Sequence, residues 1–315
     1  MMRSYSWLAL ALGSGMSAQA LAQAQPVALT PSSGWHVNYA DDSCRLLRTF
    51  GANGDQSVLA IDQFEPGDAF QLLVASKLMV RARVADARPR QVRLRFGPGE
   101  AEQELAMRQV EFQDMPAIMT SWAMLGTLPD EEAASAEHAA AKARGDRKAM
   151  HLADVLAPIK PMTSEREAAI SFLSITGVAR KPLVLTTGPM AKPMAALRAC
   201  TDDLLRHWGV DPTTHKSLSR RVTPKGIPSK WVTSNDYPTQ LLASGTQGLI
   251  QFRLSIDETG KVSDCHIQQS SRPAEFDRAV CKIMSTRGRF DPALDAEGRP
   301  VKSYWRSSFA FLMGG

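Results

Sequence analysis

The sequence has none of the short motifs that mark common catalytic or metal sites. It contains no C-x-x-C or H-E-x-x-H spacing that would hold a metal ion, and no G-x-S-x-G, Walker or dinucleotide-binding fingerprint. No carboxylate or nucleophile forms a typical active-site pattern with any of the six histidines, which are His36, His138, His151, His207, His215 and His266. We therefore expect no catalytic residue, no metal site and no cofactor, and a protein that is not an enzyme.

The sequence also has no long basic block and no long apolar run. No block of Lys and Arg interleaved with aromatic residues occurs despite a formal net charge of +5, so nucleic acid is not an expected partner. The apolar run at residues 7–12 is far shorter than the roughly 20 residues that a membrane-spanning helix needs. With 44% hydrophobic and 22% charged residues, the 315-residue chain has the composition of a globular protein of about two domains.

The first 24 residues have the three parts of a secretory signal peptide. Arg3 lies in the basic part, residues 7–12 form the apolar part, and three alternative A-x-A sites precede residue 25. We therefore expect residues 1–24 to be removed on export to the periplasm. An uncleaved membrane anchor is the alternative, although small and polar residues interrupt the apolar run.

The C-terminal stretch has the pattern of a small α+β module in two layers. Apolar and polar residues alternate over residues 248–256, which predicts a strand buried on one face. The turn-forming residues 257–260 and a second apolar pattern over residues 261–268 complete an antiparallel hairpin. A third strand is predicted within the aromatic-rich residues 301–313.

A helix is predicted between the second and third of these strands. Ser270 or Ser271 can cap it, Pro273 suits its first turn, and Gly288 ends it. Four apolar residues recur at helical spacing, namely Phe276, Val280, Ile283 and Met284. The helix should cover the hairpin, because a hairpin cannot bury its apolar face alone, and the result is a β-β-α-β module.

The same stretch carries a series of short motifs in a fixed order. They are Tyr237-Pro238, Gly248-x-Ile250-x-Phe252, Asp257-x-x-Gly260-Lys261-Val262-x-Asp264, Ser270-Ser271, Phe276-Asp277-x-Ala279, Arg289-Phe290-x-Pro292-Ala293 and Gly298-Arg299-Pro300-Val301. Each motif is weak alone, but the ordered series resembles the C-terminal domain of TonB-family energy transducers. The resemblance covers roughly the last quarter of the chain, residues 236–315.

The resemblance implies how this module binds a partner. TonB-family domains take a short peptide of an outer-membrane transporter as an added strand beside their last strand, near the Tyr-Pro pair. The expected peptide-binding residues are therefore Tyr237, Pro238, Ser303, Tyr304, Arg306, Ser307 and Ser308. Arg306, Ser308 and Ser303 are expected to be exposed. Transducers of that family also have an uncleaved membrane helix and a long proline-rich spacer, and this sequence shows neither, so energy transduction is not carried over.

Residues 34–210 predict a separate β-rich domain, a sandwich or partial barrel with a terminal helix. Its strands are expected at residues 35–39, 45–50, 58–64, 70–75, 91–96, 168–177 and 183–187. An alanine-rich helix is expected within residues 130–145, and the terminal helix at residues 193–208. Residues 211–235 are basic and contain several prolines, which indicates a solvated linker.

The four cysteines are an even number, which in an exported protein is typical of disulfide bonds. Cys265 lies on the second strand of the hairpin and Cys281 on the helix above it, so they can meet if Cys265 faces inward. Cys44 and Cys200 are then left to join an early strand to the terminal helix of the first domain. The alternative is buried reduced thiols.

These observations lead to two main hypotheses for function. The first is an exported periplasmic binding protein whose module recognises an extended peptide of an outer-membrane transporter or another envelope protein. The second is a structural or adaptor protein of the envelope, in which the module only packs on the first domain or forms a homodimer. A third, weaker hypothesis is an exported enzyme with its site in the β-rich domain.

Overall fold

The computed structural model describes residues 25–52, 54–80, 90–146, 158–270 and 273–313. The expected signal peptide, residues 1–24, lies outside this part of the chain, as does Ser271. Within the described residues, no helix is long and apolar enough to cross a membrane.

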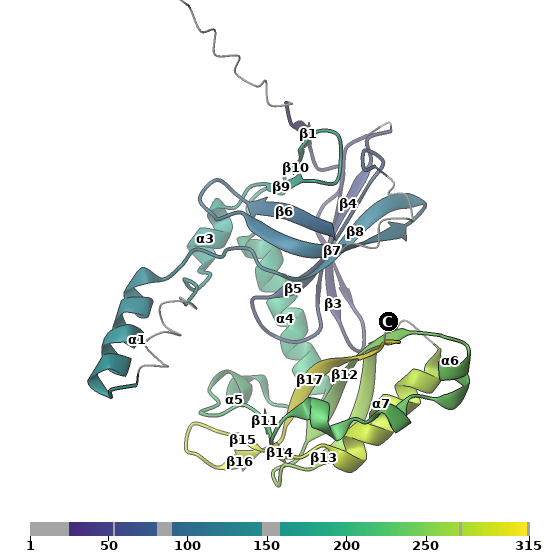
Figure 1. The fold of residues 1–315 in the computed structure, drawn as a ribbon. Helices are drawn as coiled ribbons and strands as arrows, with labels where there is room; N and C mark the ends of the chain where they lie inside the picture. The colour runs from purple at the N-terminus through teal and green to yellow at the C-terminus, as the bar shows by residue number, and fades with distance from the viewer. Residues whose placement is uncertain (1–24, 53, 81–89, 147–157, 271–272, 314–315) are drawn as a thin grey trace, which may run out of the picture.

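The N-terminal half is built on one curled sheet (Figure 1). Its strands are β1 (Val27–Leu29), β2 (His36–Tyr39), β3 (Cys44–Phe50), β4 (Ser57–Gln63), β5 (Phe70–Ser76), β6 (Arg90–Phe96), β7 (Gln103–Phe112), β8 (Met115–Ala123), β9 (Leu173–Thr176) and β10 (Leu183–Leu185). Their order is β1-β10-β9-β6-β7-β8-β5-β4-β3-β2, and only β1 and β10 run parallel. The β-rich character agrees with the sequence, and the sheet is continuous rather than divided into two stacked sheets.

The two ends of this sheet approach each other. The chain that follows β1 lies beside the end of β3, where the Gly51 N–H donates to the Thr30 carbonyl at 2.8 Å and Pro31 pairs with Phe50. The curl therefore partly closes the sheet around an apolar core. Its fully buried side chains include Phe50, Phe96, Leu46, Leu59 and Leu94.

Helix α4 (Ala191–His207) packs against β3 and β2 and extends toward the C-terminal module (Figure 1). Leu197 and Leu204 lie in the core with Cys200, whose disulfide to Cys44 spans a Cα–Cα distance of 6.0 Å. The bond joins α4 to Cys44, the first residue of β3. This is the pairing expected from the sequence once Cys265 is paired with Cys281. Helix α1 (Glu131–Ala143) begins after Asp130, whose side chain accepts a hydrogen bond from the Ala133 N–H at 3.1 Å.

Several elements of the N-terminal half differ from the sequence-based expectation. The strands β7 and β8 were not expected, because their connection is the two-residue turn Gln113-Asp114, in which both residues have positive φ (48° and 63°) without the glycine that usually marks such a turn. The strand expected over residues 168–177 is shorter and begins after a helix, α3 (Ser164–Ala169). Thr163 caps this helix, accepting a hydrogen bond from the Arg166 N–H.

The C-terminal module has the expected β-β-α-β order. Its sheet consists of β13 (Val262–Ser270), β12 (Gly248–Ile256) and β17 (Ser303–Phe311) in that spatial order, all antiparallel. Helix α7 (Ala274–Arg287) covers one face with its four expected apolar residues, and the Cys265–Cys281 disulfide ties it to β13. Ser270 belongs to β13 instead of capping α7, because it pairs with Ile250 of β12; Pro273 occupies the cap position.

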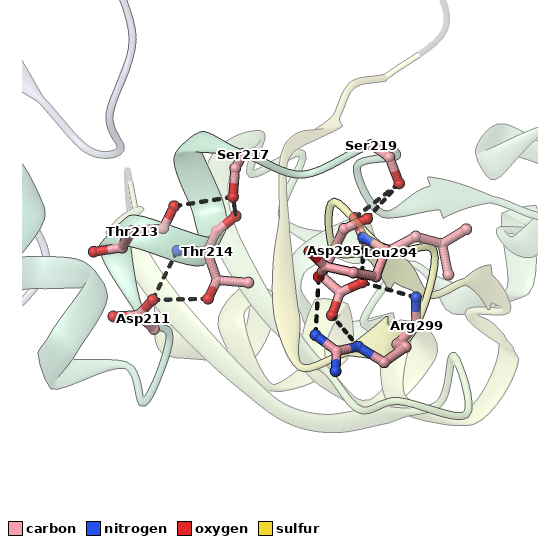
Figure 2. A network of polar contacts seen from close by, with 9 residues as sticks. Asp211, Thr213, Thr214, Ser217, Ser219, Leu294, Asp295 and Arg299 are labelled. Atoms are coloured by element: carbon pink, nitrogen blue, oxygen red, sulfur yellow. Dashed lines mark hydrogen bonds and ion pairs between the residues drawn. The ribbon is translucent and has the colours of Figure 1, made fainter.

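Residues 211–235 carry short elements and lie against this module, so much of the segment is not a solvated linker. Figure 2 shows Asp211 capping a short helix, where its carboxylate accepts hydrogen bonds from the Thr214 N–H at 2.7 Å and hydroxyl at 2.8 Å. Further along, the Ser219 hydroxyl donates to the Asp295 carbonyl at 2.5 Å.

The remaining short elements of the C-terminal half complete the module. They are α5 (Pro212–Lys216), β11 (Thr223–Pro224), the 3₁₀ turns η1 (Pro228–Trp231) and η2 (Ser234–Asp236), α6 (Thr239–Ala243), β14 (Phe290–Asp291), β15 (Ala293–Leu294) and β16 (Pro300–Val301). Strand β11 pairs with β14, and β15 pairs with β16. The first pairing fixes the segment before the module to the loop that follows α7, and the second lies within that loop.

Candidate functional site

Strand β17 is the edge strand of the C-terminal sheet. It pairs with β12 along its whole length without a register shift, and no backbone hydrogen bond joins its other side to any segment that the structure describes. The outer side of β17 therefore presents a row of backbone N–H and C=O groups that another strand could pair with.

The two faces of β17 have different neighbours, because successive side chains of a strand point to opposite faces. Trp305, Phe309 and Phe311 contribute to the apolar cluster beneath α7. Ser303 shares their face and is only 3% exposed, so the exposure expected for it from the sequence is wrong. Strand alternation itself puts Ser303 on the face of Trp305, opposite to Arg306 and Ser308, and it pairs with Ile256 at the buried end of β12.

Arg306 lies on the opposite face and joins the module to the N-terminal half. Its guanidinium donates hydrogen bonds to the side-chain oxygens of Gln251 at 2.6 Å and Gln268 at 2.7 Å. It also forms an ion pair with Glu65 at 3.4 Å and lies 4.9 Å from the ring centre of Phe64. The residue is thus held within the protein, and its charge is already compensated.

A cleft of about 540 Å³ opens beside Arg306, between the two halves of the protein. Leu249, Gln251, Ser307 and Ser308 line its module side, and the loop between β4 and β5 lines much of the other side. Its volume is within the range of about 300–1,000 Å³ that is usual for ligand pockets. Ser307 is half-buried and Ser308 exposed, so the middle of β17 borders this open space.

Trp122 projects from the N-terminal half at the same cleft. It belongs to a β-bulge, in which Ser121 and Trp122 of β8 lie opposite the single residue Gln71 of β5. Trp122 has φ of 64° and is 70% exposed. A left-handed conformation costs a non-glycine residue about 1–2 kcal/mol. Sequence reasoning did not find Trp122, because no residue pattern signals a bulge that depends on strand pairing.

Gln71, opposite the bulge, is also unusual. It is 6% exposed, it lines the cleft, and its Oε1 has no hydrogen-bond partner in the described part of the protein. A buried amide oxygen without a donor is costly, and native proteins contain few such groups. A strained aromatic residue and an unsatisfied amide therefore lie next to each other in the cleft wall.

The comparisons with known proteins identify the module. The family described as the Gram-negative bacterial TonB protein C-terminal matches residues 233–312, which contain the three-stranded sheet and α7. The C-terminal module is a TonB-family domain. No curated protein matches the chain. Domains of this family interact with outer-membrane proteins, so the TonB-type module is a protein-interaction module.

The Tyr237-Pro238 pair of the TonB-type module lies at the C-terminal end of β17. The Tyr237 ring packs edge-on against Phe276 and Phe311, at centroid distances of 5.7 and 5.2 Å, and its hydroxyl donates to the Thr246 carbonyl at 2.6 Å. Pro238 is the residue that precedes α6. In this arrangement the pair packs at the end of the sheet on its α7 side, and it does not line the cleft.

Tyr304 lies in the junction between the two halves, although the resemblance suggests a peptide contact. It is 7% exposed, and its ring packs edge-on against Trp208 at 5.2 Å and stacks on His215 at 5.3 Å. Burial, supported by Glu65, raises the pKa of the Tyr304 hydroxyl well above its ordinary value. Its side chain is therefore not accessible to a peptide while the junction is closed.

His215 is a buried titratable residue of the same junction. It is 5% exposed, its Nδ1 has no hydrogen-bond partner among the described residues, and Arg221 Nη1 lies 3.1 Å from its Nε2. Burial lowers the pKa of His215 from 6.5 to about 4. The charges of Arg221 and Lys216 act in the same direction, and Asp202 opposes them.

We expect the protein to lose stability between pH 6.5 and pH 4 because of His215. The unfolded chain takes up a proton below pH 6.5, while the folded protein resists protonation until about pH 4. The free energy of unfolding should fall by about 3 kcal/mol over this interval. Urea unfolding at several pH values measures the slope. His215→Phe keeps an aromatic ring against Tyr304 and should flatten the slope; an unchanged slope contradicts the assignment.

Proposed function

We propose that this is a periplasmic binding protein whose TonB-type module takes up an extended peptide as an added strand at β17. The partner is a segment of an outer-membrane transporter or another envelope protein. The observation that carries the proposal is the unpaired outer edge of β17, which borders an open cleft at Ser307 and Ser308. The protein acts by binding and carries out no reaction of its own.

The edge of β17 has the properties of a template for another strand. Its nine residues pair with β12 without a bulge, so its outer groups follow the regular spacing that an incoming strand needs. Natural proteins usually protect such edges with lysine, proline or a bulge. Residues 303–311 contain neither lysine nor proline, and the single charge, Arg306, is engaged within the protein.

The adaptor hypothesis has one observation in its favour. The polar face of the module binds the N-terminal half through Arg306 and through the contact of His266 Nε2 with Asp42 Oδ2 at 2.6 Å. These contacts join the two halves in the structure. They involve the face of the sheet, however, and leave its edge at β17 unpaired, so packing alone does not account for the edge.

Direct titration tests the proposal. The probes are synthetic peptides of roughly ten residues, the length of a strand, copied from the extended N-terminal segments of outer-membrane transporters of the host bacterium. Isothermal titration should give one bound peptide per chain, and the same peptides with proline at alternate positions should not bind. A protein that binds none of them, and forms a dimer in light scattering, would favour the adaptor role.

Export can be tested separately. Protein recovered from the periplasm is expected to lack about the first 24 residues, because their pattern is that of a cleavable signal. It should also contain no free thiol, since both cysteine pairs are bonded. Intact mass with and without alkylation measures both features. Retention of Met1, or alkylation of the native protein, would contradict this expectation.

A further inference from the structure

We infer that the N-terminal half forms the second wall of the peptide site, and that Trp122 contacts a large uncharged side chain of the bound peptide. The inference rests on the proposed strand addition at β17 and assigns a role to the N-terminal half of the chain. The site is then the cleft between the two halves, with the TonB-type module on one side and the β8 bulge on the other.

The direction of side chains in an added strand leads to this arrangement. Alternate residues of a strand point to opposite faces, so every second residue of a peptide paired with β17 points to the face that carries Arg306 and Ser308. On that face lie Leu249 and Gln251, and beyond them lies the cleft. Half of the peptide side chains therefore enter the cleft instead of water.

The charges of the cleft select the kind of side chain. Glu65 is paired with Arg306, and Asp62 is paired with Arg45 at 2.6 Å. Among the lining residues that the structure describes, one of each sign remains, Asp68 and Arg108, so these side chains give the cleft no net charge to attract a peptide ion. The exposed Trp122 ring offers a large apolar surface, which favours an aromatic or branched aliphatic residue.

The conformation of Trp122 supports a binding role. Glycine would adopt its φ of 64° without strain, and a smaller or polar residue would suit an exposed bulge, yet this position carries the largest apolar side chain. Residues with strained backbone conformations cluster at active sites, ligand clamps and switch regions.

The test uses the full-length mature protein and the transporter peptides described above. Trp122→Gly removes the ring and suits the positive φ, so the variant should melt no lower than the wild type. It should bind the peptide about tenfold more weakly. Trp122→Phe keeps a ring and should recover most of the affinity. Tyr39→Ala removes an exposed aromatic residue that does not line the cleft and should bind like the wild type.

The outcomes separate this inference from the proposed function. If whichever of Ser307→Pro and Ser308→Pro stays folded prevents binding, and Trp122→Gly does not weaken it, strand addition stands and the inference is wrong. If no peptide binds, both are wrong. Fluorescence gives an independent readout, because peptide should protect the wild type from iodide quenching more than it protects Trp122→Phe. A concentration-dependent dimer that Trp122→Gly abolishes would show that a second copy occupies the cleft, and would overturn the inference.

Discussion

Two proline variants, Ser307→Pro and Ser308→Pro, test strand addition at β17. At least one of them is expected to lose peptide binding. Proline has no backbone N–H, so it removes a hydrogen bond from the strand without removing an apolar side chain. Amide groups of neighbouring residues in a strand point in opposite directions. One substitution therefore removes a donor from the free edge of β17, and the other removes a donor that faces β12.

The two variants should differ in their consequences. Loss of the outward donor should weaken peptide binding by about 100-fold, because the proline ring also blocks the approach of a strand, and should leave the fold intact. Loss of the inward donor should lower stability, since Ser307 pairs with Phe252 and Ser308 with Gln251 in the β12–β17 ladder. Titration measures the affinity, and circular dichroism with thermal melting measures the fold.

Alanine provides the matched control at both positions. Ser307→Ala and Ser308→Ala keep the backbone N–H and remove only a hydroxyl, so both should bind the peptide with little change. If both proline variants fold and retain the peptide with unchanged affinity, strand addition at β17 is wrong for this protein.

The sequence predicted the TonB-type module well because its signals are local. Strand β12 shows strict alternation and is followed by the turn at Gly260, so its bounds were found at both ends. The pairing of Cys265 with Cys281 followed from a strand and a helix that had to pack together.

The features that were missed depend on contacts between distant segments. The aromatic run of β17 has two faces, and the alternation of its residues does not tell which face another part of the chain covers. Tyr304 is buried because Trp208 and His215 pack against its ring at the junction. The bulge at Trp122 exists because β8 pairs with β5 about 50 residues away, and no local pattern reports such a register shift.

Removal of the Cys44–Cys200 disulfide is expected to have the largest effect on stability. The bond closes a loop with a sequence separation of 156, against 16 for Cys265–Cys281. In the chain-entropy model these loops correspond to about 5 and about 3 kcal/mol respectively. Since whole domains are stable by only about 5–15 kcal/mol, Cys44→Ala with Cys200→Ala should bring the N-terminal half close to unfolding at ordinary temperature.

The structure gives this bond a second consequence. Helix α4 is joined to β3 through Cys200 and ends at His207, next to Trp208. The Trp208 indole contacts Tyr304, and the Arg253 guanidinium carbon lies 4.4 Å from the centre of the Trp208 ring. A loosened α4 should therefore weaken the junction and widen the cleft beside β17. Peptide affinity should fall in this variant even at temperatures where the TonB-type module remains folded.

Urea unfolding followed by circular dichroism, with titration of the same samples, measures both effects. The matched control is Cys265→Ala with Cys281→Ala, which removes the short-loop bond and keeps the α4 attachment. A smaller loss of stability in the Cys44 and Cys200 variant than in this control would contradict the entropic account, because the longer loop should cost more. Unchanged peptide affinity after removal of the α4 attachment would show that the junction does not control the cleft, and that the edge of β17 binds independently of the N-terminal half.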